Sequence, residues 1–406
     1  MATRQSETDS ERGQSTRSVH SGSQRIKGYH SLTTPIVQTA TYTFRNTQEL
    51  VDFMESKVWG DGVDRGEYGR YGNPTIAAVE RRLAELDAGE DAVLYGSGMA
   101  AITTLLLAVL PSGAHIVMTD DCYRRTRQFC QTYLRRLGIT TSIVPAGDYD
   151  ALEGAIRPGK TRFLITESPT NPYLHVVDME RFAAIGKRSR TLTIIDSTFA
   201  TPVNQRPLEW GVDFVMHSAT KYFSGHNDMM GGVIVGRSQH IRALKDARGV
   251  LGSVLDPHSA YLLERGIKTL GLRVQQQNET AMHVANFLEE HPAIEQVWYP
   301  GLPSHPEHHI AKEQMDGYGG VVSFTIHGDL QQTSRFIDRL RIPYIAPSLG
   351  GVESLIEQPA LMSYYEKTPR ERQELNMHDN LVRFAVGIED AADLIADLTQ
   401  ALAAVH

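Results

Sequence analysis

Cysteine is scarce in this sequence: Cys122 and Cys130 are the two cysteines among 406 residues. Two cysteines cannot form a disulfide framework, and by themselves they cannot hold a metal cluster. Neither lies beside an obvious activating base in the sequence, so a structural role is favoured for both. This usage is typical of a reducing compartment, and we expect the protein to be cytoplasmic.

Long apolar runs and an excess of positive charge are also missing. The longest apolar run, residues 100–110, includes two threonines and is too short to cross a bilayer. The net charge of -8 argues against a nucleic-acid or anionic-membrane partner. The first twenty residues are polar and mix both signs of charge, which argues against a secretory signal. We predict a disordered tail at residues 1 to about 17.

What is present is the composition of an ordinary globular enzyme, with 41% hydrophobic and 22% charged residues. A chain of 406 residues allows two or three structural units. The threonine-rich stretch 33–44 predicts an extended arm rather than a helix. We predict an N-terminal tail and arm (1–70), a large domain (71–262) and a small C-terminal domain (263–406).

Strand-like and helix-like segments alternate from about residue 92 to residue 235. This alternation predicts an α/β fold with a mainly parallel sheet that helices cover on both faces. Beyond about residue 262 the pattern changes and predicts a smaller α+β domain. The predicted strands are 92–95, 115–119, 141–144, 161–166, 192–196, 214–216, 231–235, 295–299, 320–326 and 381–386. The predicted helices are 75–87, 98–110, 123–137, 152–156, 179–187, 269–288 and 331–340, with one more at the C-terminus.

Candidate functional residues follow five of the predicted strands directly. Parallel sheets bind ligands at the carboxyl ends of their strands, so we expect these segments to form one composite site. The segments are 96–98, 120–123, 167–171, Asp196 and 218–221.

Lys221 is the central candidate, because it stands among hydroxyls and glycine after an apolar strand. A lysine forms the Schiff base with the aldehyde of pyridoxal phosphate (PLP), and the hydroxyls of Ser218 and Thr220 can hold the phosphate. Most lysines, taken alone, are solvated surface residues. Gly98 and Met99 open a predicted helix directly after a strand, where free amides bind phosphate, although a plain tight turn fits as well.

Three further side chains suit the ring of such a cofactor. Asp196 could pair with a protonated pyridine nitrogen, or it could cap a turn. The ring of Tyr123 could stack on the cofactor, or it could belong to the core. Asn171 could donate a hydrogen bond to the phenolic oxygen of the cofactor, or it could belong to a turn bracketed by prolines.

Arg383 is a lone charge in an apolar predicted strand. A buried arginine needs a partner, which predicts either a carboxylate-bearing substrate or a structural ion pair. Ser348 could help to bind the same substrate carboxylate. Tyr68 and Arg70 precede the first helix of the large domain, and an arm that carries such residues often completes the site of a neighbouring subunit.

Three histidines, at positions 305, 308 and 309, cluster in one loop. The loop has no cysteine and one carboxylate, so we predict a solvated loop and no metal site.

Taken together, these motifs resemble the Cys/Met-metabolism PLP enzymes of fold type I over nearly the whole chain. The motifs that carry the resemblance are Y-G-R-Y-G-N-P-T (68–75), S-G-M-A-A (97–101), E-S-P-T-N-P (167–172), H-S-A-T-K-Y-F-S-G-H-N-D (217–228) and P-S-L-G-G-V-E-S-L (347–355). The resemblance implies a PLP-dependent transferase fold with Lys221 as the Schiff-base lysine. It also implies the site roles of the remaining candidates: Tyr123, Asp196, Asn171, Ser218, Thr220, Gly98 and Met99 at the cofactor, Tyr68 and Arg70 from an adjacent subunit, and Arg383 and Ser348 at the substrate carboxylate.

Four longer runs resemble the plant-type cystathionine γ-synthase branch in particular: 121–127, 272–278, 299–307 and 342–348. Two positions depart from common family patterns. Gly96 replaces the first serine of the usual S-S-G-M motif. Pro347 stands where bacterial and animal-type members often carry a glutamate, which matches the plant-type pattern.

The resemblance implies γ-replacement on an activated homoserine ester by cysteine, which gives cystathionine for transsulfuration and methionine biosynthesis. The freed amine of Lys221 would remove the α-proton, with Tyr68 or Tyr123 as a proton shuttle. The alternative is a γ-lyase, which releases a 2-oxo acid and ammonia. The family resemblance also implies amino-acid substrates and a homotetramer of two site-sharing dimers.

Overall fold

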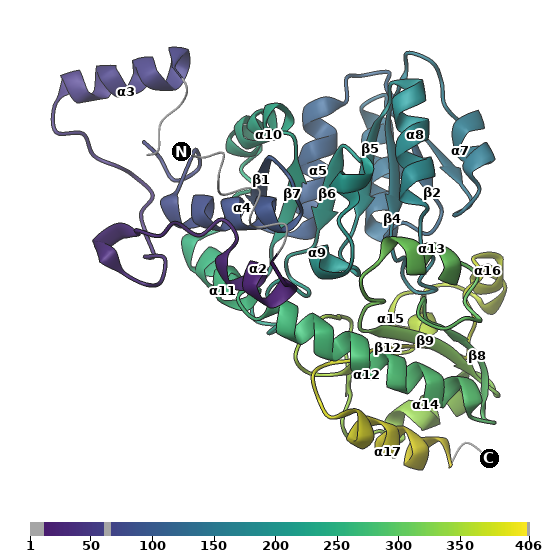
Figure 1. Cartoon of the computed structure of the whole chain (residues 1–406). Helices are drawn as coiled ribbons and strands as arrows, with labels where there is room; N and C mark the ends of the chain where they lie inside the picture. The colour runs from purple at the N-terminus through teal and green to yellow at the C-terminus, as the bar shows by residue number, and fades with distance from the viewer. Residues whose placement is uncertain (1–11, 61–65, 404–406) are drawn as a thin grey trace.

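The computed structural model describes residues 12–60 and 66–403, and it contains two sheets joined by one continuous apolar core (Figure 1). The larger sheet has the strand order β1-β7-β6-β5-β4-β2-β3. All of its strands run parallel except β7, which pairs antiparallel with both β1 and β6. The prediction of a mainly parallel α/β sheet is confirmed. Its strands are β1 (Asp91–Tyr95), β2 (His115–Thr119), β3 (Thr140–Val144), β4 (Thr161–Glu167), β5 (Leu192–Asp196), β6 (Phe214–His217) and β7 (Gly232–Gly236).

Helices cover both faces of the larger sheet, because successive residues of a strand point to opposite faces. In β1, Val93 and Tyr95 pack into one apolar cluster, while Ala92 and Leu94 pack into another. Helices α5 and α10 contribute to the first cluster, and α4 contributes to the second. The helices around this sheet are α4 (Pro74–Leu86), α5 (Gly98–Val109), α6 (Arg124–Gln128), α7 (Tyr149–Gly154), α8 (Met179–Ser189), α9 (Thr201–Asn204), α10 (Ser238–Leu251) and α11 (Pro257–Ile267).

The predicted helix 123–137 contains a wider turn than expected. The α-helical part, α6, is followed by a π-helical segment at Phe129–Leu134. This segment buries Cys130 and Leu134 against the larger sheet. Burial raises the pKa of the Cys130 thiol to about 12, which agrees with a structural role.

The smaller sheet has the order β10-β11-β12-β9-β8 and is mostly antiparallel, as an α+β domain requires. The long helix α12 packs on β8 and β9, and α17 packs on α12 (Figure 1). Its strands are β8 (Ile294–Trp298), β9 (Val321–Ile326), β10 (Tyr344–Ile345), β11 (Leu355–Glu357) and β12 (Leu381–Ala385). Its helices are α12 (Leu270–Glu290), α13 (His308–Gln314), α14 (Leu330–Arg339), α15 (Pro359–Met362), α16 (Pro369–Glu374) and α17 (Ala391–Leu402).

The N-terminal segment is more ordered than the sequence predicted. Residues 1–11 of the predicted tail lie outside the described residues, but helix α2 (Gln14–His20) begins before residue 17. Arg17 donates a hydrogen bond to the carbonyl of Leu86 (3.0 Å), and Ser18 accepts one from the amide of Gly271 (3.0 Å). The tail prediction is therefore wrong for residues 14–17, because these polar side chains find partners far along the chain.

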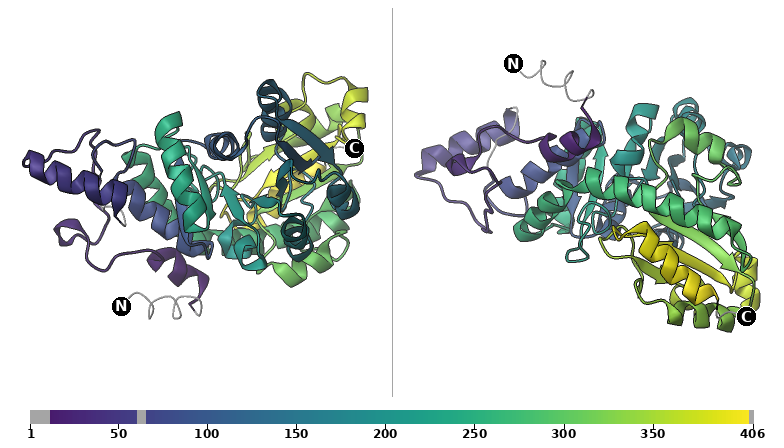
Figure 2. Two further views of the ribbon diagram at one scale, coloured as in Figure 1. Left: turned by 90° about the horizontal axis from the view of Figure 1, so that it is seen from above. Right: turned by 60° about the horizontal axis from the view of Figure 1, so that its bottom comes forward.

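After α2, the chain forms an extended arm that leads to helix α3 (Thr47–Trp59). Both views in Figure 2 show the arm and α3 reaching away from the body, on the side opposite the smaller sheet. Large apolar side chains of this segment are exposed, among them Tyr29, Leu32 and Trp59. No helix in the described parts of the chain combines the length and apolarity that crossing a membrane requires. The domain limits at residues 70 and 262 stay predictions.

Candidate active site

The predicted functional segments lie at the carboxyl ends of β1, β2, β4, β5 and β6, at one edge of the larger sheet. The smaller sheet lies against this edge (Figure 1). Ser323 on β9 donates a hydrogen bond to the carbonyl of Pro172, and Arg383 on β12 donates one to Asn171 Oδ1. Residues from both sheets therefore meet in one place. For the larger sheet, this is the composite site that was predicted at the carboxyl ends of its strands.

Lys221 lies in the turn that follows β6, and its Nζ donates a hydrogen bond to Ser348 Oγ at 2.8 Å. Burial, and then the positive charge of Arg383, lowers the pKa of Lys221 to about 8, while Glu357 acts in the opposite direction. An amine with this pKa can take up or release a proton near neutral pH. Lys221 is therefore not the solvated surface lysine of the alternative interpretation.

The start of α5 lies against the turn after β6. Ser97 caps α5 by accepting a hydrogen bond from the amide of Ala100. The first amides of a helix have no acceptor within the helix, so the amides of Gly98 and Met99 remain available to a ligand. A Cβ at Gly98 would lie 3.1 Å from Ser218 Cβ, so glycine allows the close approach of the two segments. Thr220 Oγ1 is held by Gly231, from which it accepts at 3.0 Å. Free amides beside two hydroxyls suit a phosphate.

We expect Gly232→Ala to destabilise the protein by about 1–3 kcal/mol, because overpacking strains the backbone. A Cβ at position 232 would lie 2.7 Å from Gly98 Cα and still closer to the Ser97 carbonyl, so the start of α5 must shift. The expected results are a lower melting temperature and weaker retention of PLP on dilution. Gly154→Ala is the matched control, because a Cβ there meets nothing within 4 Å. Equal retention of PLP in both variants would contradict this prediction.

Asp196 ends β5 as a half-buried carboxylate. Its Oδ1 accepts hydrogen bonds from the amide of Thr198 (3.1 Å) and from Thr198 Oγ1 (2.5 Å). Thr198 Oγ1 in turn accepts from the amide of Ser218 (2.8 Å), so the carboxylate is tied to the lysine turn. Burial raises the pKa of Asp196. A protonated ring nitrogen in the site would stabilise its anionic form, which fits the cofactor expected from the sequence.

Tyr123 precedes α6 with a 45% exposed side chain, which is not the environment of a core tyrosine. Its amide donates a hydrogen bond to Glu167 Oε2 at 2.9 Å. Burial, together with the nearby carboxylates of Asp196 and Asp121, holds the pKa of Glu167 well above its usual value. The ring of Tyr123 is thus accessible to a stacking ligand, while the hydrogen bond to Glu167 holds its backbone.

The sequence left two interpretations of Arg383, a structural ion pair or a contact with a substrate carboxylate, and its contacts allow both. It forms an ion pair with Glu357 (Nη1 to Oε1, 3.1 Å), and Nη1 also donates to Asn171 Oδ1 (3.1 Å). Nη2 donates to the carbonyl of Ser348 (3.0 Å). Nε has no partner among the residues that the structure describes. The structural ion pair is present, and a buried donor still remains for a ligand.

Tyr68 and Arg70 are not brought to Lys221 by contacts within this chain. Arg70 donates a hydrogen bond to the carbonyl of Gly249 (2.6 Å), and its guanidinium lies 5.2 Å from the ring centroid of Tyr68. Tyr68 also forms an isolated antiparallel bridge with Thr41 of the arm. Their role at an adjacent subunit's site stays a prediction.

Two residues of this region were missed by the sequence reasoning. Glu357 could have been found by a search for the partner that a buried Arg383 requires. Thr198 could have been found from its position two residues after Asp196, where a hydroxyl commonly bonds a carboxylate. Both belong to short segments that carry no motif of their own.

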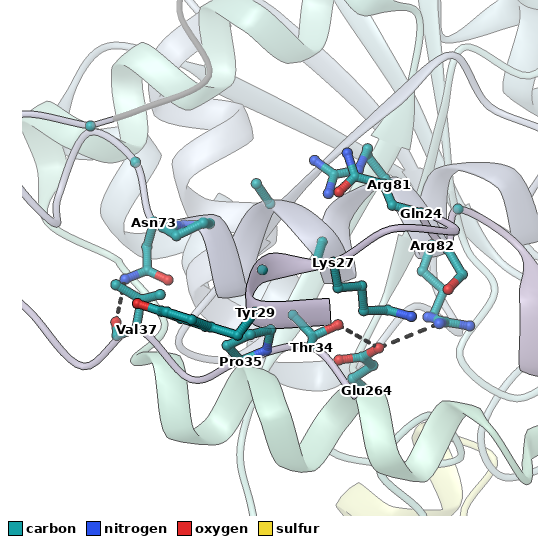
Figure 3. Close-up of a pocket in the computed structure, with 18 of the residues that line it drawn as sticks. Gln24, Lys27, Tyr29, Thr34, Pro35, Val37, Asn73, Arg81, Arg82 and Glu264 are labelled. Carbon is teal, nitrogen blue, oxygen red and sulfur yellow. Dashed lines mark hydrogen bonds and ion pairs between the residues drawn. The ribbon is translucent and has the colours of Figure 1, made fainter. Parts of the chain in front are cut away.

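A separate cavity of about 560 Å³ lies between the arm, α4 and α11 (Figure 3). Its lining includes Lys27, Tyr29, Arg81 and the buried ion pair between Arg82 and Glu264. It contains none of the predicted site residues. We therefore place the candidate active site at the strand edge and not in this cavity.

The prediction of a solvated histidine loop is wrong for His305, which is buried. Its Nδ1 lies 3.4 Å from Glu307 Oε2, and Glu307 also pairs with His175, whose pKa it raises. The loop thereby connects the smaller sheet with the segment after β4. Within residues 12–60 and 66–403, no group of three or more His, Cys, Asp or Glu side chains is arranged to hold a metal ion.

Comparisons with known proteins found similarity over nearly the whole chain. The sequence profile of the family described as Cys/Met metabolism PLP-dependent enzyme matches residues 15–403. Cystathionine gamma-synthase 1, chloroplastic, of Arabidopsis thaliana is 49% identical over 389 residues, which cover 95% of this chain and 68% of that protein. Cystathionine gamma-lyase of Bacillus subtilis is 41% identical, covering 95% of this chain and 97% of that protein. A crystal structure of metB from Corynebacterium glutamicum superposes with a TM-score of 0.89 at 34% identity, covering 98% of this chain and 100% of that one.

Proposed function

The chain belongs to the family of Cys/Met metabolism PLP-dependent enzymes, and within that family we propose that it catalyses γ-replacement. The substrate would be an activated homoserine ester, the incoming thiol would be cysteine, and the product would be cystathionine. The cofactor of this family is pyridoxal 5'-phosphate. The observation that carries the proposal is the half-buried Lys221, whose amine has a lowered pKa beside a buried arginine that keeps an open donor.

The described residues fit this cofactor. When bound, PLP supplies an electron-withdrawing ring that stabilises negative charge on the carbons of the amino acid. Asp196 would hold the ring nitrogen, Tyr123 would stack on the ring, and Asn171 would donate to the ring oxygen. Asn171 presents its Oδ1 to Arg383, which leaves its Nδ2 as the donor that this role requires. The phosphate would bind between α5 and the lysine turn, held by Ser218, Thr220 and the amides of Gly98 and Met99.

Lys221 moves the protons in this proposal. Its amine, with a pKa lowered to about 8, would take the α-proton of the substrate when neutral and return a proton later in the reaction. Ser348 Oγ accepts a hydrogen bond from the amine and fixes its position. Arg383 and Ser348 would bind the substrate carboxylate, and Tyr123 or Tyr68 would serve as a second proton carrier.

We further propose that the protein works as a homotetramer of two site-sharing dimers. The arm exposes large apolar side chains that a second copy would cover, and Tyr68 and Arg70 on this arm would then reach the site of that copy. We place the protein in the cytoplasm, because Cys122 and Cys130 are both buried as free thiols.

The second candidate is a γ-lyase, which carries out α,γ-elimination to a 2-oxo acid and ammonia. The 41% identity with a cystathionine gamma-lyase supports it, because both reactions need the same amine, arginine and ring contacts. The synthase is favoured by the 49% identity with a cystathionine gamma-synthase and by Pro347, which matches the plant-type pattern.

The decisive experiment supplies the holoenzyme with each homoserine donor in turn, with and without cysteine. The donors are the phosphate, acetyl and succinyl esters and the guanidine derivative canavanine. We expect cystathionine to form with cysteine from at least one ester, at a rate well above that of 2-oxobutanoate release without thiol. Release of a 2-oxo acid that is independent of thiol, with no cystathionine, would establish the lyase instead.

A further inference from the structure

Glu357 and Arg383 are direct cross-strand partners in the smaller sheet. Strands β11 and β12 pair antiparallel in a register that places Glu357 opposite Arg383, so their side chains share one face. The carboxylate and guanidinium are 4% and 7% exposed and lie 3.1 Å apart. The sheet register, and not a flexible loop, therefore sets the position of this carboxylate.

The contacts of Arg383 leave one edge of its guanidinium open. A guanidinium has five N–H donors in a fixed plane. Nη1 donates a hydrogen bond to Asn171 Oδ1 and forms the ion pair with Glu357 Oε1, and Nη2 donates one hydrogen bond to the Ser348 carbonyl. Among the described residues, Nε–H has no partner, and Nη2 keeps one donor without a recorded partner. Nε and Nη2 lie along the same edge, where a carboxylate can accept two parallel bonds.

We propose that Glu357 is a positioning residue for substrate recognition, which holds Nη1 so that the Nε–Nη2 edge of Arg383 faces the α-carboxylate of the amino-acid substrate. This inference rests on the proposed function, which assigns the substrate carboxylate to Arg383. Glu357 acts through Arg383 and does not itself touch the substrate. Without Glu357, Nη1 would keep its hydrogen bond to Asn171 but lose its charged partner, so the direction of the open edge would be less firmly fixed.

The charges around the pair agree with this role. Burial raises the pKa of Glu357, and the positive charges of Arg383 and then Lys221 oppose this rise. The other titratable groups that act on Arg383 are Tyr222, Glu167 and Tyr123. Without the carboxylate of Glu357, the two cations would face each other uncompensated, and the pKa of Lys221 would fall further.

The test compares the binding of L-norvaline and L-norvalinamide to the holoenzyme by calorimetric titration. Norvaline has the α-carboxylate but no γ-leaving group, and its amide lacks the carboxylate charge. We expect Glu357→Leu to weaken norvaline binding about tenfold, because this is the effect of losing about one charge-assisted hydrogen bond. Binding of norvalinamide should change less than about twofold. Glu357→Gln keeps an acceptor oxygen near Nη1, so we expect norvaline binding within about threefold of the wild type.

Two further variants separate the possible outcomes. Glu80→Leu removes another buried carboxylate, which pairs with Arg248 at 2.6 Å, and we expect it to lower the melting temperature without changing the norvaline-to-amide ratio. If Glu357→Leu does not fold, Glu357→Asp, whose shorter side chain withdraws the carboxylate, should weaken norvaline binding by at least about threefold. An unchanged norvaline-to-amide ratio in Glu357→Leu, or in Glu357→Asp where the leucine variant does not fold, would overturn the inference. An unchanged ratio in Arg383→Leu would instead overturn the carboxylate site of the proposed function.

Discussion

Replacing Lys221 with alanine is expected to lower kcat by at least about 10³-fold while the protein stays folded, because both the cofactor anchor and the base are lost. Lys221 is half-buried and donates to Ser348, and among the described residues no second lysine bonds Ser348 or Arg383. The measurement is the rate of cystathionine formation under saturating substrates. The visible absorbance of the enzyme-bound cofactor should also be lost.

Lys268→Ala is a suitable control for this prediction. Lys268 is partly exposed and pairs at 3.8 Å with Glu264 near the arm, so its loss should leave the rate nearly unchanged. A Lys221→Ala variant that retained more than about a tenth of the wild-type rate would contradict the role of Lys221 as base.

The pH dependence of the rate follows from the same amine. Burial and Arg383 lower the pKa of Lys221 to about 8, and the neutral form is the one that accepts a proton. The rate at saturating substrate should therefore rise with pH and level off above about 8. Glu357→Gln removes the nearby anion, so the same rise should occur at lower pH.

Replacing Arg383 with leucine is expected to raise the KM for the amino-acid donor about 10²-fold, with a smaller effect on kcat. The substrate carboxylate would lose its bidentate partner, whereas Lys221 would keep its contact with Ser348. The substitution should also cost about 3–5 kcal/mol of stability, because it leaves the buried Glu357 without a counter-charge. Steady-state kinetics over a range of donor concentrations and thermal unfolding measure the two effects separately.

A double variant, Arg383→Leu with Glu357→Leu, distinguishes binding from folding. It removes both charges, so we expect it to recover most of the lost stability while the KM stays high. Arg383→Lys keeps the charge but lacks the planar fork, and we expect an intermediate KM. If the double variant regained a normal KM, the carboxylate of the substrate could not be bound by Arg383.

The sequence predicted the parts of the fold in which hydrophobic periodicity is long and regular. Helix α12 and strands β2 and β5 lie within about two residues of the predicted ranges, because each buries a continuous apolar pattern. Helices α3, α10 and α11 were not predicted. The loop at His305 was placed in solvent, since its partners Tyr173 and His175 are more than a hundred residues away.

The candidate site was predictable for a different reason. Residues that directly follow parallel strands meet at one edge whatever the rest of the fold does, so Asp196, Asn171 and Lys221 could be placed together in advance. A buried Arg383 indicates that some anionic partner exists, but the position of Glu357 beside it depends on the register of a sheet that the sequence pattern does not encode. Within residues 12–60 and 66–403, Tyr68 and Arg70 bond no other candidate site residue, so their role at a neighbouring subunit stays a prediction.

Helix α2 has a consequence for how the protein is made. Ser18 bonds Gly271, which lies 253 residues further along the chain, and Arg17 and Gln14 bond Leu86 and Val203. At about 5–20 residues per second, a ribosome needs roughly 13–50 s to make the chain between Ser18 and Gly271. During that interval the amino-terminal helix has no binding surface on α12. The contact of α2 with α12 therefore forms only after the larger sheet has been synthesised, whereas its contacts with α4 can form earlier.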